Sequence, residues 1–402
     1  MNSPYLGGND MSATQNKETQ TKIEKPVAKK VAKEQIKDTV IHTGDYSEVN
    51  SVESYDYNDF KELPKAKQVM KNFETDYKDF VDYIMRITHR IWEQKGIGVI
   101  YDTYHNNVTM HLSSTNAVGI DKVIAGTLQT LHGFPDRKLI GQNVIWSNHG
   151  KDGYMSSHRI LSTATNINQS EFGPATNKKI NFRTVVDCAV ENNRIYEEWL
   201  VRDNLWMAKQ LGVDVNELAK RMAKGTVTND GTNHTQYGLG SNMKGQFFPE
   251  KHTAKDDSIG ELVKEFISRV YQYRYFSDVV EYYHENAVVH YICDKDLLGH
   301  TQIQGMLINL YASFPNAEFI TDRITVNGTK EDNTYDVSVR WRMNGIHEGI
   351  GMFGDPSYKP VEFMGITHYR IRDRKIIEEW FTFDGLDILR QTYLGDEDIT
   401  TE

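Results

Sequence analysis

The stretch that decides the fold occurs twice: Arg194–Leu205 reads RIYEEWLVRDNL and Lys375–Leu386 reads KIIEEWFTFDGL. In both, a basic residue and an isoleucine precede Glu-Glu-Trp, and an Asp follows the Trp by four positions. The alternation of residue types predicts a β-strand. Because side chains alternate between the faces of a strand, Glu197 and Glu198 point in opposite directions and are not a matched acid/base pair.

The repetition extends well beyond this phrase. Tyr104–His111 (YHNNVTMH) matches Tyr283–His290 (YHENAVVH), and Phe134-Pro135 matches Phe314-Pro315. The offset between the matches grows from 179 to 181 residues along the chain, in steps that fall at positions typical of loops. A period of this length is too long for a solenoid, so the sequence predicts two copies of one domain.

In each copy the sequence predicts helices followed by strands. Apolar residues between Phe80 and Trp92, and again between Leu262 and Tyr273, recur at steps of three and four, which predicts an amphipathic helix. Strand-like runs come later, and the tetrapeptides ENNR and RDRK predict hairpin turns between them. This order indicates an α+β domain, in which a curved, mostly antiparallel sheet and its helices enclose a small-molecule pocket.

Composition excludes some classes of function. The 402 residues are 39% hydrophobic and 25% charged, as in globular proteins, and the net charge of −10 argues against a nucleic-acid partner. No run of apolar residues is long enough to span a membrane, and the N-terminus lacks the pattern of a signal peptide, so we expect a cytoplasmic protein. The 2 cysteines are expected to be buried free thiols.

The chain divides into four expected segments. Residues 1–74, rich in Lys, Glu and Asn, predict a disordered tail. An alternative for the lysine-rich segment 22–38 is a short basic helix that contacts an acidic partner or membrane surface. Residues 75–223 form the first domain, 224–258 a flexible linker rich in Gly, Asn and Thr, and 259–396 the second domain.

The segment Gly345–Leu394 resembles the SnoaL-like branch of the nuclear-transport-factor-2-like superfamily. The matching motifs are a Gly-x-His-x-Gly strand centred on His347, the loop Gly354-x-Pro356, and the hairpin into the second Glu-Glu-Trp. The first copy matches less well, with Asn166 in place of His347, and is expected to be degenerate. The resemblance implies two tandem cone-shaped domains, each with helices packed on a strongly curved sheet.

The resemblance also implies a chemistry. Members of the family include polyketide cyclases and isomerase-like and hydrolase-like enzymes, as well as proteins without catalysis, so the fold does not fix the function. In the cyclases a His and an Asp on adjacent strands transfer protons. Here the equivalent positions hold Val186 and Leu200 in the first copy, and Thr367 and Phe381 in the second. Asp187 and His368 lie one residue further, so they should point away from the pocket.

Other residues become the candidate site. The predicted catalytic residues are Glu379, His290, His347 and Asp384, and the second copy is expected to be the active one. The predicted ligand-binding residues are Trp341, Phe381, Thr367, Tyr283, His111, Glu198 and Asp203. A Glu on an apolar wall would have a raised pKa. Ordinary alternatives are an exposed Glu paired with a base, N-capping for the two Asp, and structural roles for the two His.

Two functions remain open. The first is a cofactor-independent acid/base enzyme (a cyclase, isomerase or hydrolase) acting on an apolar carbonyl compound. The second is a non-catalytic module whose tandem copies bind a ligand or partner. In both cases we expect the copies to pair as an intramolecular pseudo-dimer. No metal site is expected, because the 14 His and 2 Cys show no metal-ligand spacing.

Overall fold

The computed structural model describes residues 38–395, except residues 65, 67, 114, 226–248 and 330–332. The first copy contains α2 (Phe80–Trp92), α3 (Gly98–Thr103), β2 (Tyr104–His111), β3 (Asn116–Val118), α4 (Ile120–Gly133), β4 (Lys138–His149), β5 (Gly153–Thr165), β6 (Lys179–Glu191), β7 (Arg194–Arg202), α5 (Asn204–Leu211) and α6 (Val215–Lys224). The second contains α7 (Ile259–Phe266), a π-helical turn (Ile267–Gln272), a 3₁₀ turn (Phe276–Asp278), α8 (Val279–Tyr282), β8 (Tyr283–Tyr291), β9 (Lys295–Leu298), α9 (Gly299–Ser313), β10 (Glu318–Thr329), β11 (Thr334–Ile346), β12 (Pro360–Arg372), β13 (Lys375–Phe383) and α10 (Gly385–Thr392). Before both copies lie β1 (Ile41–Asp45) and α1 (Tyr57–Phe60).

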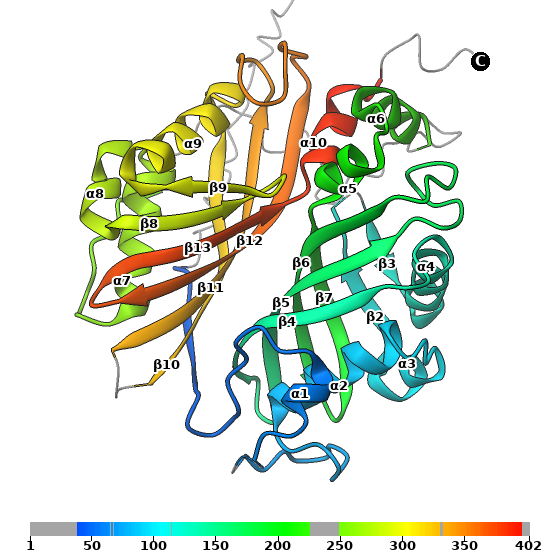
Figure 1. The fold of residues 1–402 in the computed structure, drawn as a ribbon. Coiled ribbons are helices and arrows are strands. Elements are labelled where there is room, and N and C mark those ends of the chain that lie inside the picture. The colour runs from blue at the N-terminus through cyan, green and yellow to red at the C-terminus, as the bar shows by residue number, and fades with distance from the viewer. Residues whose placement is uncertain are drawn as a thin grey trace, which may run out of the picture. The chain divides into compact units, whose positions relative to one another are not determined.

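Each copy is built on one curved sheet (Figure 1). The strand order of the first sheet is β3-β2-β7-β6-β5-β4. The second sheet has the same order, written from the same edge as β9-β8-β13-β12-β11-β10. It adds β1 beside β10. Neighbouring strands are antiparallel except that β2 pairs in parallel with β7, β8 with β13, and β1 with β10. The α+β class and the repeated cone-shaped domain are therefore confirmed.

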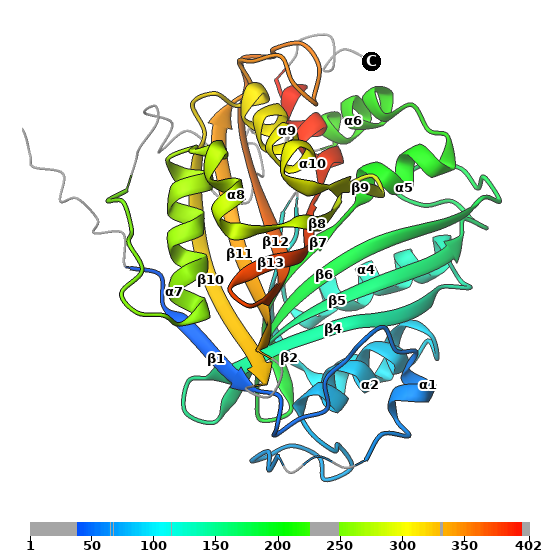
Figure 2. The same ribbon diagram turned by 60° about the vertical axis from the view of Figure 1, so that its left-hand side comes forward.

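The first helix of each copy forms where the apolar period predicts it. Asp79 caps α2 by accepting a hydrogen bond from the backbone of Asp82 at 2.7 Å, and Phe80, Tyr83 and Ile87 on the inner face are buried. Ser258 caps α7 in the same way, through the backbone nitrogen of Glu261. Figure 2 shows α7 and α9 lying along the second sheet, which they cover from one side. Burial of these amphipathic faces fixes one face of each sheet as the interior.

The predicted hairpins are confirmed at both turns. Asn192 and Asn193 between β6 and β7 have φ of 50° and 67°. Asp373 and Arg374 between β12 and β13 have φ of 49° and 62°. Two successive positive φ angles are the signature of the two-residue type I′ turn, whose twist matches that of the paired strands. The turns thereby set the register that brings Glu-Glu-Trp to the same place in each sheet.

The expectation of a disordered tail over residues 1–74 is wrong for its described part; residues 1–37, which include most of the lysine-rich segment, lie outside the described residues. Residues 41–45 form β1, which pairs with β10 of the second copy (Figure 2). Val52 and Phe60 are buried in the core of the first copy. The sequence did not predict this ordered segment, because backbone hydrogen bonds hold β1 at a sheet edge and few apolar residues anchor the rest of residues 38–74.

The expected linker is described only at its ends. Residues 226–248 lie outside the described part of the chain, and residue 224 closes α6. Near the other end, His252 binds the carboxylate of Glu261 through Nε2 at 2.8 Å. The domain boundaries at residues 75–223 and 259–396 stay a prediction.

The two copies contact each other through sheet faces opposite to those their helices cover. The guanidinium group of Arg159 lies 3.4 Å from the ring centre of Trp380. The equivalent Arg340 lies 3.6 Å from the ring centre of Trp199. Cation–π contacts of this kind gain strength when they are desolvated. The tryptophan of the repeated phrase thus belongs to the contact between the copies.

Polar groups complete this contact. The hydroxyl groups of Ser157 and Ser338, which are equivalent positions, hydrogen-bond at 2.8 Å. Asp187 accepts a hydrogen bond from Arg340 at 2.9 Å, and His368 shares one with Ser157 at 2.8 Å. Burial lowers the pKa of His368 well below its usual value, so its ring is neutral. The two copies therefore meet through the same set of sheet positions, as expected of an intramolecular pair.

Replacing Asp187 should destabilise the fold strongly. Asp187→Ala leaves the buried Arg340 without its carboxylate, and we expect the free energy of unfolding in urea to fall by about 3 kcal/mol. The matched control is Asp322→Ala, because Asp322 and Arg342 pair at the same 2.9 Å but with side chains 22% and 27% exposed. A partly exposed pair should cost about 1 kcal/mol or less. Equal losses in the two variants would contradict a structural role for the buried pair.

Candidate functional site

A cavity of about 370 Å³ lies inside the first copy, between helices α2 and α4 and strands β5, β6 and β7. Isoleucines of α2 form much of its apolar wall, and exposed residues of α4, among them Lys122 and Gln129, border its mouth. This volume is within the range of small-molecule sites, and an apolar wall with few polar groups is typical of them.

The sheet wall of the cavity follows from strand register. Residues paired across β5, β6 and β7 project from the same face, so the cavity receives every second side chain of each strand. The rows are Cys188 with Glu198; His158 with Val186 and Leu200; and Ile160 with Thr184 and Arg202.

Glu198 is the ionisable group at the apolar end of the wall. Its carboxylate accepts a hydrogen bond from the Tyr104 hydroxyl at 2.9 Å and a weaker one from the Cys188 thiol at 3.8 Å, both to Oε2. No described protein group binds the other oxygen, Oε1. Burial raises the pKa of Glu198 to about 7, and it raises the pKa of Tyr104 well above its usual value. Near neutral pH the carboxyl group can therefore gain or lose a proton beside a phenol that stays protonated.

Two arginines lie at the other end of the cavity. Arg202 donates to Glu171 at 3.0 Å and to Asn204 at 2.7 Å. Arg137 donates from Nε and Nη2 to the hydroxyl group of Ser162, at 3.2 and 2.9 Å. Burial, and then the charge of Arg202, lower the pKa of Arg137 to about 9, so it remains a cation at neutral pH.

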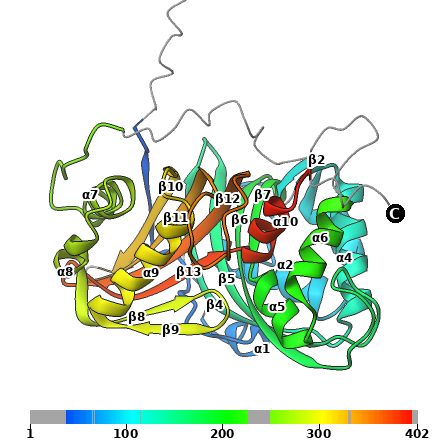
Figure 3. The ribbon, with the colours of Figure 1, turned by 90° about the horizontal axis from the view of Figure 1, so that it is seen from above.

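The second copy contributes one residue to this end. Asp384 borders the cavity and accepts a hydrogen bond from the Asn204 side chain at 2.5 Å. It also caps α10, which lies beside α5 and α6 (Figure 3). Burial, followed by the charge of Asp387, raises the pKa of Asp384 to about 7. Asp203, its counterpart, caps α5 and accepts from the backbone of Cys293 at 2.6 Å.

Two further polar atoms on the wall lack protein partners. The Oγ1 atom of Thr184 and the Nε2 atom of His158 are buried without a hydrogen bond in the described structure. Burial lowers the pKa of His158 to about 3, so its ring is neutral. Buried groups of this kind are normally satisfied, which makes both available to a ligand or a water molecule.

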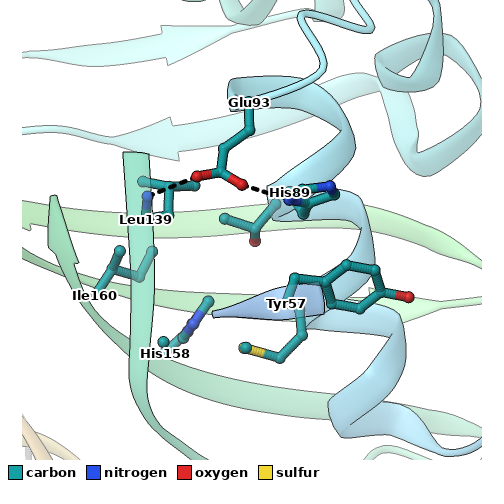
Figure 4. Close-up of a pocket in the computed structure, with 9 residues that line it drawn as sticks. Tyr57, His89, Glu93, Leu139, His158 and Ile160 are labelled. Carbon is teal, nitrogen blue, oxygen red and sulfur yellow. Dashed lines mark hydrogen bonds and ion pairs between the residues drawn. The ribbon is translucent and has the colours of Figure 1, made fainter. Parts of the chain in front are cut away.

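A smaller chamber adjoins the cavity behind His158 (Figure 4). It measures about 10 Å³, enough for about one water molecule, and shares His158, Ile160 and Thr88 with the cavity wall. Both carboxylate oxygens of Glu93 are occupied there, one by His89 Nδ1 at 2.5 Å and one by the backbone nitrogen of Leu139 at 2.9 Å.

The second copy, which is expected to be the active one, is packed at the positions that line the cavity of the first. At the wall positions equivalent to Ile160, Leu200 and Arg202 the second copy has Trp341, Phe381 and Phe383, all fully buried. Ring centres of Trp341 and Phe381 lie 5.0 Å apart, and those of Phe381 and Phe383 lie 5.8 Å apart. Larger side chains fill the space that is open in the first copy. The second copy has a separate hollow of about 400 Å³ beside β8, β9 and α9, which Glu379 does not border.

Glu379 and its neighbours are enclosed in this filled interior. The Tyr283 hydroxyl donates to Glu379 at 2.6 Å, and Trp341 Nε1 donates to Thr367 Oγ1 at 2.9 Å. Burial raises the pKa of Glu379 to about 8. Glu379, predicted to be catalytic, and Trp341, Phe381, Thr367 and Tyr283, predicted to bind a ligand, therefore border neither the cavity of the first copy nor the hollow beside α9.

The predicted histidines also lie outside the cavity. His111 binds Glu197 at 2.8 Å and stacks on Trp199, while His290 binds both Glu378 and Asp296, at 2.8 and 2.7 Å. Both therefore lie on the strand face opposite to Glu198 and Glu379. In the register of the parallel strand pairs, His111 lies beside Trp199 and His290 beside Trp380, so each projects from the face of its Trp and not from that of Glu198 or Glu379.

His347 and the two residues displaced from the acid/base positions, Asp187 and His368, also lie outside the cavity. His347 is buried beside Phe314 and hydrogen-bonds Ser357 at 3.1 Å, away from Glu379. Asp187 and His368 point into the contact between the copies, which confirms that they face away from the pocket.

Of the predicted residues, Glu198 and Asp384 border the cavity. The sequence analysis missed four other residues that border it: Tyr104, Arg137, His158 and Thr184. Tyr104 had a signal, because it is the repeated equivalent of Tyr283. His158 and Thr184 could have been found by extending strand alternation from Leu200 across the sheet. Arg137 gave no such signal, since it precedes β4 and reaches the wall from its edge.

Two searches of the described residues gave negative results. No described helix is long and apolar enough to cross a membrane. No group of three or more metal-binding side chains comes together among the residues that the structure places.

Comparison with known proteins gives the family. The family model described as SnoaL-like polyketide cyclase matches residues 82–211 and 261–392, more than half of the chain. No match to a curated protein sequence is found.

Solved structures match one copy at a time. A SnoaL-like polyketide cyclase from Agrobacterium tumefaciens is 15% identical, covers 33% of this chain and 97% of its own, and has a TM-score of 0.28. IdmH from Streptomyces antibioticus is 19% identical over 33% of this chain and 98% of its own, with a TM-score of 0.29. TsrD from Streptomyces laurentii is 14% identical over 33% and 94%, with a TM-score of 0.29.

The buried Glu379 should make stability depend on pH. The usual pKa of a glutamate side chain is 4.5. Between this pH and about 8, Glu379 is therefore ionised in the unfolded chain and protonated in the folded chain. Its contribution to stability is therefore complete at low pH and is lost as pH rises, at about 1.4 kcal/mol per pH unit. We expect Glu379→Gln to be more stable than the parent in urea at pH 8, with the difference shrinking towards pH 5.

The control for this measurement is Glu348→Gln, which alters an exposed carboxylate. Its difference from the parent should not change with pH. A Glu379→Gln variant whose difference is equally independent of pH would show that Glu379 is ionised in the folded protein.

Proposed function

The chain belongs to the SnoaL-like polyketide cyclase family, and from this premise we propose that its first copy is a cofactor-independent acid/base enzyme acting on an apolar carbonyl compound. The observation that carries the proposal is Glu198. It is a buried carboxyl group with a raised pKa, it borders a cavity of about 370 Å³, and one of its oxygens has no described protein partner. Groups perturbed in this way are concentrated at catalytic sites.

The proposed reaction begins with proton transfer. Glu198, as the carboxylate, takes a proton from the carbon next to the carbonyl group through Oε1, while Tyr104 keeps Oε2 in place. The substrate becomes an enolate, whose oxygen needs a hydrogen-bond donor. The donor we assign to it is the unpartnered hydroxyl group of Thr184, which lies two rows along the wall from Glu198. In an isomerisation the protonated Glu198 returns the proton to a different carbon of the enolate. In a cyclisation the enolate carbon attacks a second carbonyl group of the substrate, and the alkoxide that forms takes the proton.

One observation favours the alternative, a non-catalytic ligand-binding module. The positions where the related cyclases carry their acid/base pair hold Val186 and Leu200, which border the cavity without an ionisable group. In that case Glu198 would be a buried polar group that orients a ligand and takes no part in chemistry.

Exchange of substrate protons distinguishes the two functions. In deuterated buffer, apolar ketones and 1,3-diketones offered to the parent protein should gain deuterium next to the carbonyl group, followed by NMR. The rate should rise with pH through about 7 and then level off, because the ionised form of Glu198 is the base. Glu198→Gln should lower the rate by about 100-fold or more.

The matched control is Glu197→Gln. Glu197 is the neighbouring residue, but it faces the opposite side of β7 and pairs with His111. Exchange should persist in this variant. Equal rates in Glu198→Gln and the parent would remove Glu198 from the mechanism, and ligand binding without any exchange would favour the non-catalytic module.

A further inference from the structure

We propose that the first copy binds an amphipathic carboxylate, whose carboxylate group is held by Arg137 and whose hydrocarbon part lies along the isoleucines of α2. This names the substrate class of the site proposed above and rests on that proposed function.

Arg137 is a buried cation without a carboxylate partner. Its side chain is 5% exposed and borders the cavity. Its hydrogen bonds go to the neutral hydroxyl group of Ser162, and its guanidinium group lies between the rings of Trp92 and Phe182, at 4.5 and 5.1 Å from their centres. A buried charge is costly unless an opposite charge and hydrogen bonds compensate it.

The charged neighbours of Arg137 do not provide that compensation. Arg202 on β7 is itself a cation and is paired with Glu171 at 3.0 Å. Glu93 at the end of α2 attracts Arg137 weakly, but His89 and the backbone of Leu139 occupy its two oxygens (Figure 4). One uncompensated positive charge on the wall of an apolar cavity matches a ligand with one negative charge.

The second copy supports this reading by contrast. The position equivalent to Arg137 is Ala317, and the position equivalent to Arg202 is Phe383. Both lie in the interior that aromatic side chains fill. The arginines and the open cavity therefore occur in the same copy, and where the cavity is filled the charges are absent.

A carboxylate rather than a more highly charged group fits the site. The planar guanidinium group of Arg137 matches a carboxylate in geometry. Glu198 and Arg137 lie at different ends of the sheet wall. Glu198 is in the row of Ser156, and Arg137 binds Ser162, six residues along β5, or at most roughly 20 Å. The ligand's carboxylate and its reacting carbonyl should thus be at opposite ends of the molecule.

The test uses two fluorescent probes that differ in charge, 1-pyrenebutyrate and 1-pyrenebutanol. The parent protein should bind the carboxylate about tenfold more tightly than the alcohol, or better, since a hydrogen bond between charged groups is worth about 1.5–3 kcal/mol. Arg137→Met should abolish this preference by weakening the carboxylate and leaving the alcohol unchanged. Arg137→Lys, which keeps the charge and loses the planar fork, should retain part of it.

Controls separate this proposal from its alternatives. Lys122→Met removes an exposed cation at the cavity mouth and should leave the preference intact. Glu198→Gln should also keep the preference, so that failure of the catalytic proposal and failure of this one give different results. A parent protein that binds both probes equally, binds neither, or keeps its preference in Arg137→Met would overturn the assignment.

Discussion

The two-residue period of the long strands is the constraint on which the rest of this structure depends. In β7, Glu197 and Trp199 lie on the face that meets the second copy, while Glu198 and Leu200 lie on the face that the helices enclose. One sheet therefore serves two purposes at once. Its outer face joins the copies through stacked arginine and tryptophan side chains, and its inner face forms the wall of a cavity. A shift of register by one residue would exchange the two faces.

Within this shared frame, side-chain volume decides whether the space against β5, β6 and β7, or against their counterparts β11, β12 and β13, stays open. Ile160 and Leu200 leave space in the first copy, whereas Trp341 and Phe381 occupy the same positions in the second. A filled aromatic interior stabilises the fold by burial and dispersion, and an open one gives up part of that stabilisation. The protein thus pairs a well-packed copy with an open one. The open copy carries Arg137 and Arg202 at its cavity, and we propose that a ligand compensates the charge of Arg137 there.

Parts of this arrangement could be predicted from the sequence. The repeated phrase and its neighbours predicted two α+β domains, the two hairpins and the outward direction of Asp187 and His368, because all depend on local periodicity and spacing. The same alternation placed Glu198 and Glu379 on the inner face. It could not say which inner face was open, since this depends on how rings from separate strands pack together. The strand β1 was missed for a related reason, because its partner β10 lies in the distant second copy.

The sequence by itself determined that the domain is duplicated, that each copy belongs to the α+β class, and that each strand has two chemically different faces. These properties depend on the spacing of residue types along the chain, which acts within a single strand or helix. Tertiary structure alone decided that the first copy holds the cavity, that Asp384 of the second copy borders it, and that Arg137 lies in its wall without a carboxylate. These are properties of volume and charge balance. They arise only when side chains from distant segments come within contact distance of one another.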